Sequence, residues 1–116
     1  MIIYHKSNCS TSLEALRLLK QAGVQPLIKE YIVDPPTQKE LRELLKMLGC
    51  KAIDIVRKKE PLYKEQFADK KMSNAEWIRV LSKNPVLIER PIVIEGNKAL
   101  IGRPPETVLN LVSAKK

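Results

Sequence analysis

Residues 2–12 read IIYHKSNCSTS, and this segment decides the fold. Its apolar part, Ile2–Tyr4, is typical of a short strand, and the polar residues after it are typical of a turn. Residues 13–22 have the pattern of a helix, which Gly23 is well placed to end because glycine accepts the left-handed backbone of a helix C-terminus. The sequence predicts a strand, a turn and a helix, with Cys9 where the helix begins.

This position makes Cys9 a candidate nucleophile. Backbone N–H groups at a helix N-terminus lack partners within the helix and carry the positive end of its dipole, so they stabilise a thiolate. The same groups bind oxyanions. A single cysteine can equally be a small buried apolar residue, but the polar neighbours Asn8 and Ser10 favour a reactive thiol.

The composition predicts one domain, covering residues 1–116, with an aliphatic core. Hydrophobic residues make up 44% of the chain and aromatic residues only 4%, so leucine, isoleucine and valine must fill the core. No apolar run is long enough to cross a membrane. The first residues also lack the basic and apolar regions of a signal peptide. We therefore expect a cytoplasmic protein.

The two cysteines, Cys9 and Cys50, are far apart in the sequence. A structural disulfide between them is not expected in a reducing compartment, and Cys50 is better interpreted as a structural residue. Ser12 stands where a CxxC motif would have its second cysteine. Two cysteines and one histidine are too few for a four-ligand zinc site, so we expect no metal.

The formal net charge of +8 and the pI of about 9.6 favour an anionic partner, either nucleic acid or a small oxyanion. Nucleic-acid binding would be better supported by aromatic residues interleaved with the basic ones, and the sequence lacks that pattern. Most lysines are therefore interpreted as surface residues. We expect a monomer that binds neither nucleic acid nor membranes.

Residues 37–84 predict a helical insert. Its first helix should start at Thr37, because Glu40 completes a capping box, and leucines spaced i, i+3, i+4 and i+7 give it one apolar face up to Gly49. The same box recurs at Ser73 and starts a later helix. The insert should also contain the end of that helix at Asn84-Pro85 and a shorter helical piece with Ile53, Val56 and Arg57.

Strands are predicted on both sides of the insert. Residues 27–33 should form a second strand, and Ile92–Glu95 and Lys98–Ile101 should form a hairpin around the turn Gly96-Asn97. Pro104 or Pro105 should open a last helix. The order β-α-β, helical insert, β-β-α predicts an α/β fold with one mixed, four-stranded sheet.

This order is that of the thioredoxin-like fold, and the residues resemble the glutaredoxin-dependent arsenate reductases. Residues 4–12 resemble the active-site loop of that family, and residues 56–59 (VRKK) resemble its arginine-lysine segment. Two later segments also match, namely residues 84–85 (NP) with 90–93 (RPIV), and residues 102–106 (GRPPE). The segments occur in the family's order and cover nearly the whole chain.

The resemblance implies an arsenate reductase in which Cys9 is the nucleophile. Cys9 would attack arsenate and displace water, glutathione would attack the adduct as co-substrate, and glutaredoxin would resolve the mixed disulfide as arsenite leaves. No bound cofactor is implied. Arg57, Arg90 and Arg103 would bind the substrate, because a guanidinium group can donate two hydrogen bonds to the oxygens of a tetrahedral dianion.

The resemblance also implies catalytic roles for His5 and Ser12. His5 would support a low pKa of Cys9 as a protonated imidazole, or would orient the loop; it can equally be a loop histidine bound to the backbone. Ser12 would donate a hydrogen bond to the thiolate or help to cap the helix. The fold further implies a cis peptide bond before Pro91.

Two other classes of protein share features with this sequence. Spx-type regulators resemble it around Arg57 and Arg90, and they bind RNA polymerase and sense oxidants through a CxxC switch. Ser12 in place of the second cysteine, together with His5 and Arg103, makes that class less suitable. A monothiol glutaredoxin-like protein is a third interpretation, which explains neither the helical insert nor the arginines. A related enzyme with a substrate other than arsenate also remains open.

Overall fold

The computed structural model describes residues 1–113, and the chain divides into two compact units. The first, here called the sheet unit, consists of residues 1–34 and the chain from Arg90 onward. The second, here called the helical unit, consists of residues 35–89. The helical unit corresponds to the predicted insert, extended by a few residues at each end.

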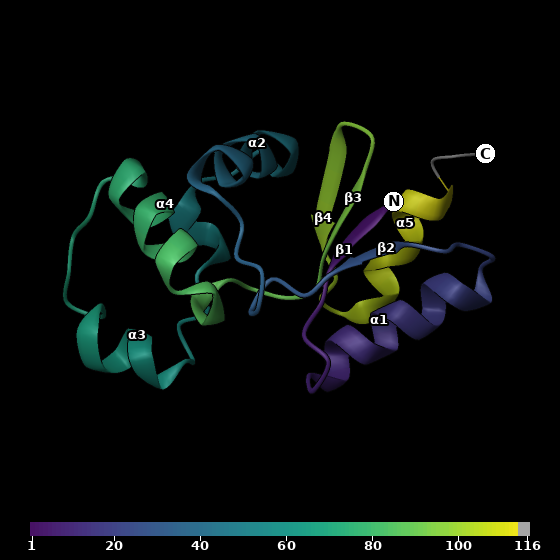
Figure 1. Cartoon of the computed structure of the whole chain (residues 1–116), viewed down its shortest axis with the longest axis horizontal. Helices are drawn as coiled ribbons and strands as arrows, with labels where there is room; N and C mark the ends of the chain where they lie inside the picture. Colours follow the sequence, from purple (N-terminus) through teal and green to yellow (C-terminus); the bar gives the residue numbers. More distant parts are fainter. Residues whose placement is uncertain (114–116) are drawn as a thin grey trace. The chain divides into compact units, whose positions relative to one another are not determined.

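The sheet unit contains four strands in the spatial order β2-β1-β3-β4 (Figure 1). The central strand β1 (Ile2–Tyr4) pairs in parallel with β2 (Leu27–Lys29) and antiparallel with β3 (Ile92–Glu95). The hairpin strand β4 (Lys98–Ile101) pairs antiparallel with β3. The predicted mixed sheet and its terminal hairpin are confirmed.

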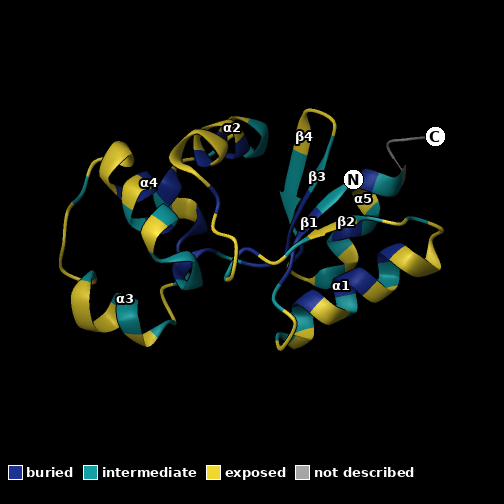
Figure 2. Cartoon of the chain, viewed as in Figure 1, coloured by how far each residue is buried: buried dark blue, intermediate teal, exposed yellow. Residues whose placement is uncertain are grey.

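An aliphatic cluster joins the helices of the sheet unit to one face of the sheet. The helix α1 (Ser10–Gln21) contributes every third or fourth residue, as an amphipathic helix should. The chain's last helical segment follows the hairpin as a 3-10 turn, η3 (Pro105–Val108), and continues as α5 (Leu109–Ser113). The fully or nearly buried members of the cluster are Ile3, Ala15, Leu16, Leu19, Val93, Val108 and Leu111 (Figure 2).

Two boundaries in this unit differ from the prediction. The helix α1 begins at Ser10 rather than residue 13, because the backbone of Cys9 is extended and forms the N-cap. The strand β2 ends at Lys29 rather than residue 33. The chain turns there, and the backbone N–H groups of Val33 and Asp34 both donate to the carbonyl of Glu30, at 3.0 and 2.9 Å.

Gly102 lies where two segments of the sheet unit approach closely. A Cβ atom at this position would lie 2.8 Å from a side-chain carbon of Val108 and 2.9 Å from one of Pro91. These distances are shorter than van der Waals contact, so only glycine fits without displacing a neighbour. The backbone N–H of Gly102 also donates to the carbonyl of Pro91, at 2.8 Å.

The helical unit is built around α2 (Gln38–Leu48) and α4 (Asn74–Lys83). Both predicted capping boxes are present, from Thr37 and from Ser73. Gly49 ends α2 with a positive φ of 70°. The buried residues of the two helices are Leu41, Leu44, Leu45, Trp77, Ile78 and Leu81.

Short segments link these helices, and two of them differ from the prediction. The piece predicted to hold Arg57 is a 3-10 helix, η1 (Ala52–Ile55), that ends earlier because Val56 forms a β-bridge with Ile88. The helix α3 (Pro61–Gln66) was not predicted, and it buries no residue (Figure 2). A second 3-10 turn, η2 (Pro85–Leu87), follows α4.

Candidate functional site

The register of the sheet brings the candidate residues of the sheet unit to one end of the strands. Tyr4 pairs with Lys29 of β2 and with Ile92 of β3, and Ile92 pairs with Ile101 of β4. These four residues form one row across the sheet. The residues one or two positions beyond this row therefore lie at the same end of the sheet; they are His5, Tyr31, Arg90 and Arg103.

Cys9 reaches this end of the sheet through the turn after His5. Its backbone N–H donates to the carbonyl of Lys6 at 3.0 Å, and its own carbonyl accepts from Leu13 in the first turn of α1, at 2.9 Å. Burial acts to raise the pKa of the half-buried thiol. Hydrogen bonds from the backbone N–H groups of Ser12 and Thr11, and from Arg90, together with the charge of Arg90, outweigh burial and lower the pKa. The structure therefore favours a thiolate at Cys9.

Arg90 is the charged group that acts on this thiol. Its side chain is only 5% exposed. Burial disfavours its charge, but hydrogen bonds to Cys9 and to Tyr31 keep the guanidinium protonated and raise its pKa. A buried cation beside a thiolate is an arrangement that also attracts anions.

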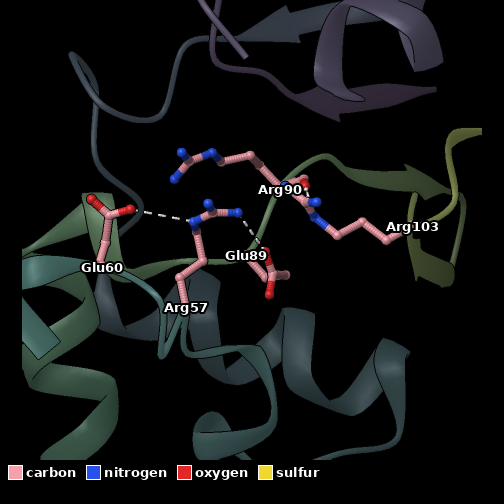
Figure 3. A network of polar contacts seen from close by, with 5 residues as sticks. All are labelled: Arg57, Glu60, Glu89, Arg90 and Arg103. Carbon is pink, nitrogen blue, oxygen red and sulfur yellow. Dashed lines mark hydrogen bonds and ion pairs between the residues drawn. The ribbon is translucent and has the colours of Figure 1, made fainter. Parts of the chain in front are cut away.

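Arg103 is exposed, lies two residues after the end of β4 and contacts the same segment. Its Nε donates to the backbone carbonyl of Arg90 at 2.8 Å (Figure 3). Both residues precede a proline, and both peptide bonds, Arg90–Pro91 and Arg103–Pro104, are cis. The predicted cis bond before Pro91 is confirmed, whereas the second cis bond was not predicted.

His5 and Ser12 are buried and bound to each other. The Nδ1 atom of His5 lies 2.5 Å from the hydroxyl oxygen of Ser12, which also accepts from the backbone N–H of Lys6 at 3.2 Å. Burial lowers the pKa of His5; Glu30 opposes this shift and Lys20 reinforces it. The lowered pKa favours the neutral imidazole. Of the two predicted roles of His5, orientation of the loop fits this geometry better than support of the thiolate by a charged ring, and a catalytic role of His5 stays a prediction.

Ser12 acts on Cys9 through its backbone. The pKa of Cys9 is lowered by the backbone N–H of Ser12, while the Ser12 hydroxyl is engaged by His5 and Lys6. The contact with Cys9 that lowers the pKa of its thiol comes from the backbone of Ser12, and the predicted bond from the Ser12 hydroxyl to the thiolate stays a prediction. The hydroxyl has a different effect, since it ties the turn before Cys9 to the first turn of α1.

Arg57 belongs to the helical unit, where it is paired with two carboxylates. Its Nη1 donates to Glu89 at 2.8 Å and its Nε donates to Glu60 at 3.4 Å (Figure 3). Its backbone N–H donates to the carbonyl of Leu87 at 2.7 Å, next to the bridge between Val56 and Ile88. The predicted role of Arg57 in binding the substrate stays a prediction.

The sequence analysis missed Tyr31. This residue was assigned to the second strand, as one of several apolar or aromatic residues in a run. In the structure it lies in the turn after β2, is fully buried and contacts Arg90. Nothing in the local sequence distinguishes it from a residue of the strand, because its role depends on a segment about sixty residues later.

Within residues 1–113, no group of three or more histidine, cysteine or acidic side chains is placed to hold a metal ion. None of the helices in the same residues is long and apolar enough to cross a membrane.

Residues 4–111 match the model of one protein family, the ArsC family. The chain belongs to the ArsC family. It is 48% identical over 112 residues to the uncharacterized protein YfgD of Escherichia coli, with 95% of this chain and 94% of the relative covered. It is 45% identical over 114 residues to the arsenate reductase of Haemophilus influenzae, with 97% of this chain and 98% of the relative covered.

A solved structure of the ArsC family supports the same assignment. The arsenate reductase from Vibrio cholerae superposes with a TM-score of 0.89 at 40% sequence identity, and the match covers 94% of each chain. The four-stranded sheet with its flanking helices is therefore the thioredoxin-like fold of this family, as the order of elements predicted.

Proposed function

We propose that this ArsC-family chain reduces arsenate to arsenite, with Cys9 as the nucleophile. The observation that carries the proposal is the setting of Cys9, a half-buried thiol at the start of α1 whose pKa is lowered by backbone N–H groups and by the buried Arg90. The arsenate reductases among its relatives support the choice of substrate.

The first step needs a thiolate and a group that holds the substrate's negative charge. The thiolate sulfur of Cys9 attacks arsenic, and one arsenate oxygen leaves as water after protonation. Arg90 serves both needs, since its guanidinium stabilises the thiolate and can donate to the arsenate oxygens. Arg103 adds a second guanidinium, which is held at the backbone carbonyl of Arg90 through its Nε.

The second step needs two electrons from outside the chain. Glutathione attacks the sulfur of the Cys9–arsenic adduct, and the electrons of the sulfur–arsenic bond stay with arsenic, which leaves as arsenite. The two sulfurs are thereby oxidised to a mixed disulfide, which a thiol of glutaredoxin then cleaves. The cytoplasm is the compartment we propose for the reaction, because these thiols are kept reduced there.

His5, Ser12 and Arg57 have supporting roles in the proposal. The buried contact between His5 and Ser12 holds the turn that presents Cys9. Arg57 is proposed as a third substrate-binding arginine from the family resemblance. Because Glu60 and Glu89 accept from two of its three nitrogens, arsenate would have to bind the guanidinium beside two negatively charged carboxylates.

The test is arsenite formation from arsenate by the pure protein, with glutathione and glutaredoxin supplied. Turnover should require both thiol reagents, should vanish in Cys9→Ser and should persist in Cys50→Ser, the matched control. Absence of turnover in the folded protein, or turnover that survives Cys9→Ser, would refute the proposal. RNA polymerase capture, or reduction of glutathione mixed disulfides without arsenate turnover, would instead favour the regulator or the glutaredoxin-like interpretation.

A further inference from the structure

Tyr31 is a fully buried phenol to which the mechanism above assigns no role. Its exposed fraction is 0%. A buried tyrosine hydroxyl nearly always has a hydrogen-bonding partner, since burial without one is unfavourable. The identity of that partner therefore indicates what the residue does.

The backbone and one aromatic neighbour fix the position of the Tyr31 ring. The turn after β2 is closed by two hydrogen bonds to the carbonyl of Glu30, so Tyr31 is directed into the sheet unit. Its ring stacks on Tyr4, with centroids 6.0 Å apart and planes 21° apart. Tyr4 is itself buried and is the last residue of β1. The phenol is thus held by the central strand of the sheet.

The hydroxyl of this fixed ring contacts the guanidinium of Arg90, which also contacts Cys9. The phenol oxygen accepts and the guanidinium donates. A guanidinium group is planar and carries its N–H donors in a fixed fork, so a contact that fixes one part of the plane also aims the rest. At the backbone, Arg103 holds the Arg90 carbonyl. Arg90 is therefore restrained at its backbone and at its guanidinium.

We propose that Tyr31 is a positioning residue that holds the Arg90 guanidinium against the sulfur of Cys9. In this role Tyr31 acts on the thiol and on the substrate through Arg90. Its effect on the thiol stands independently of the reaction. Its effect on oxyanion binding rests on the proposed arsenate reductase function.

The experiment compares Tyr31→Phe, Arg90→Ala and the double variant by their rates of iodoacetamide labelling at Cys9 across pH. All are made in a Cys50→Ser background. Tyr31→Phe keeps the ring and its stacking on Tyr4 but removes the acceptor, so the labelling midpoint should move to higher pH. Arg90→Ala should move it at least as far. The double variant should match Arg90→Ala, since Tyr31 acts only through that residue.

Tyr63→Phe is the matched control, because it removes a hydroxyl from a tyrosine of the helical unit that stacks on Trp77; its labelling profile should be unchanged. An unchanged midpoint in a folded Tyr31→Phe protein would overturn the proposal. So would a shift of equal size in the presence and absence of the Arg90 side chain, because Tyr31 would then act by another route.

Two further measurements keep the proposal testable if Tyr31→Phe does not fold or arsenate is not the substrate. In the wild-type protein, the guanidinium N–H signals of Arg90 should be protected from solvent exchange, and rapid exchange would overturn the proposal. If arsenate is turned over, Tyr31→Phe should raise its KM about tenfold, the size expected for a weakened charged hydrogen bond. If arsenate is not turned over, the labelling shift still decides the role of Tyr31.

Discussion

Cys9 and Cys50 lie at opposite ends of their helices. Cys9 is the N-cap of α1 in the sheet unit, whereas Cys50 follows Gly49, the C-cap of α2 in the helical unit. Both thiols are half-buried and free, and burial acts to raise the pKa of each. The pKa of Cys9 is nevertheless lowered, while that of Cys50 is raised by burial and by Asp54.

The comparison shows that the groups around each thiol decide the direction in which its pKa shifts. Cys9 has backbone N–H groups and a guanidinium that favour the thiolate, whereas Cys50 has burial and a carboxylate that disfavour it. Lys51 is next to Cys50 in the sequence, but its backbone N–H donates to the carboxylate of Asp54 at 2.9 Å. The charge of that carboxylate acts on Cys50. A basic residue next to a cysteine in the sequence therefore does not indicate that the pKa of its thiol is lowered in the folded protein.

Removing Arg90 should make Cys9 more like Cys50, and this is the largest effect that we expect. Arg90→Ala should raise the pKa of Cys9 and lower kcat/KM for arsenate by roughly a hundredfold, the loss typical of one charge-stabilising donor. Steady-state kinetics and iodoacetamide titration measure the two effects. Arg17→Ala is the control, because Arg17 lies on the same α1 helix but is exposed and paired with Glu14. Equal losses in both variants would contradict the prediction.

The two cysteines of the wild-type protein should differ in labelling rate near pH 7. The thiolate fraction rises as a pKa falls below the ambient pH, so Cys9 should react faster with iodoacetamide than Cys50, by at least about tenfold. Peptide mass spectrometry after short exposure measures both sites in one sample. Unfolding in urea provides the control, since the difference should disappear. Equal labelling rates in the folded protein would show that the two thiols do not differ in their thiolate fraction.

The neutral His5 predicts a pH dependence of stability that the helical unit cannot supply, because His5 is the only histidine of the chain. Its pKa in the folded protein lies below its ordinary value of 6.5. Between pH 7.5 and 5.5 the unfolded chain therefore binds more protons, and the free energy of unfolding should fall as the pH falls. Thermal unfolding measures this. His5→Asn should make the free energy of unfolding less dependent on pH in this range. An equally strong pH dependence in that variant would show that a group other than His5 causes it.

The smallest effect should come from the helical unit. Asp54→Asn removes a negative charge near Cys50 but keeps an oxygen that can accept from the backbone N–H of Lys51. The pKa of Cys50 should fall slightly, because burial still opposes the thiolate. Labelling of Cys50 across pH measures the shift, and Cys9 serves as the internal control. A rise in the pKa would show that Asp54 acts other than by its charge.

The sequence predicted the features that short segments determine. The two capping boxes and the hairpin turn each depend on residues within a few positions of one another, and all are present. The end of β2 was wrong because it depends on the length of β1, which pairs only up to Lys29. The helix α3 was missed because it buries no residue and therefore has no apolar stripe.

The residues of the candidate site likewise fall into those that the sequence indicated and those whose state or contacts depend on distant segments. Cys9 could be selected from its position between a strand and a helix, and the family resemblance indicated Arg90 and Arg103. The neutral state of His5 could not be predicted, since burial depends on the whole sheet unit. Tyr31 was missed because its partner, Arg90, is distant in the sequence and only the pairing of β1 with β2 and β3 brings the two together.

Ser12 also constrains how this protein could evolve. A cysteine at this position would complete a CxxC motif and give the chain its own resolving thiol. The serine hydroxyl is fully buried, lies 2.5 Å from His5 and accepts from Lys6, and a larger sulfur with weak hydrogen bonding could not reproduce both contacts. In the proposed reaction, the need for external thiols thus follows from the packing around Ser12, and one substitution could not supply an internal thiol without loosening the turn that presents Cys9.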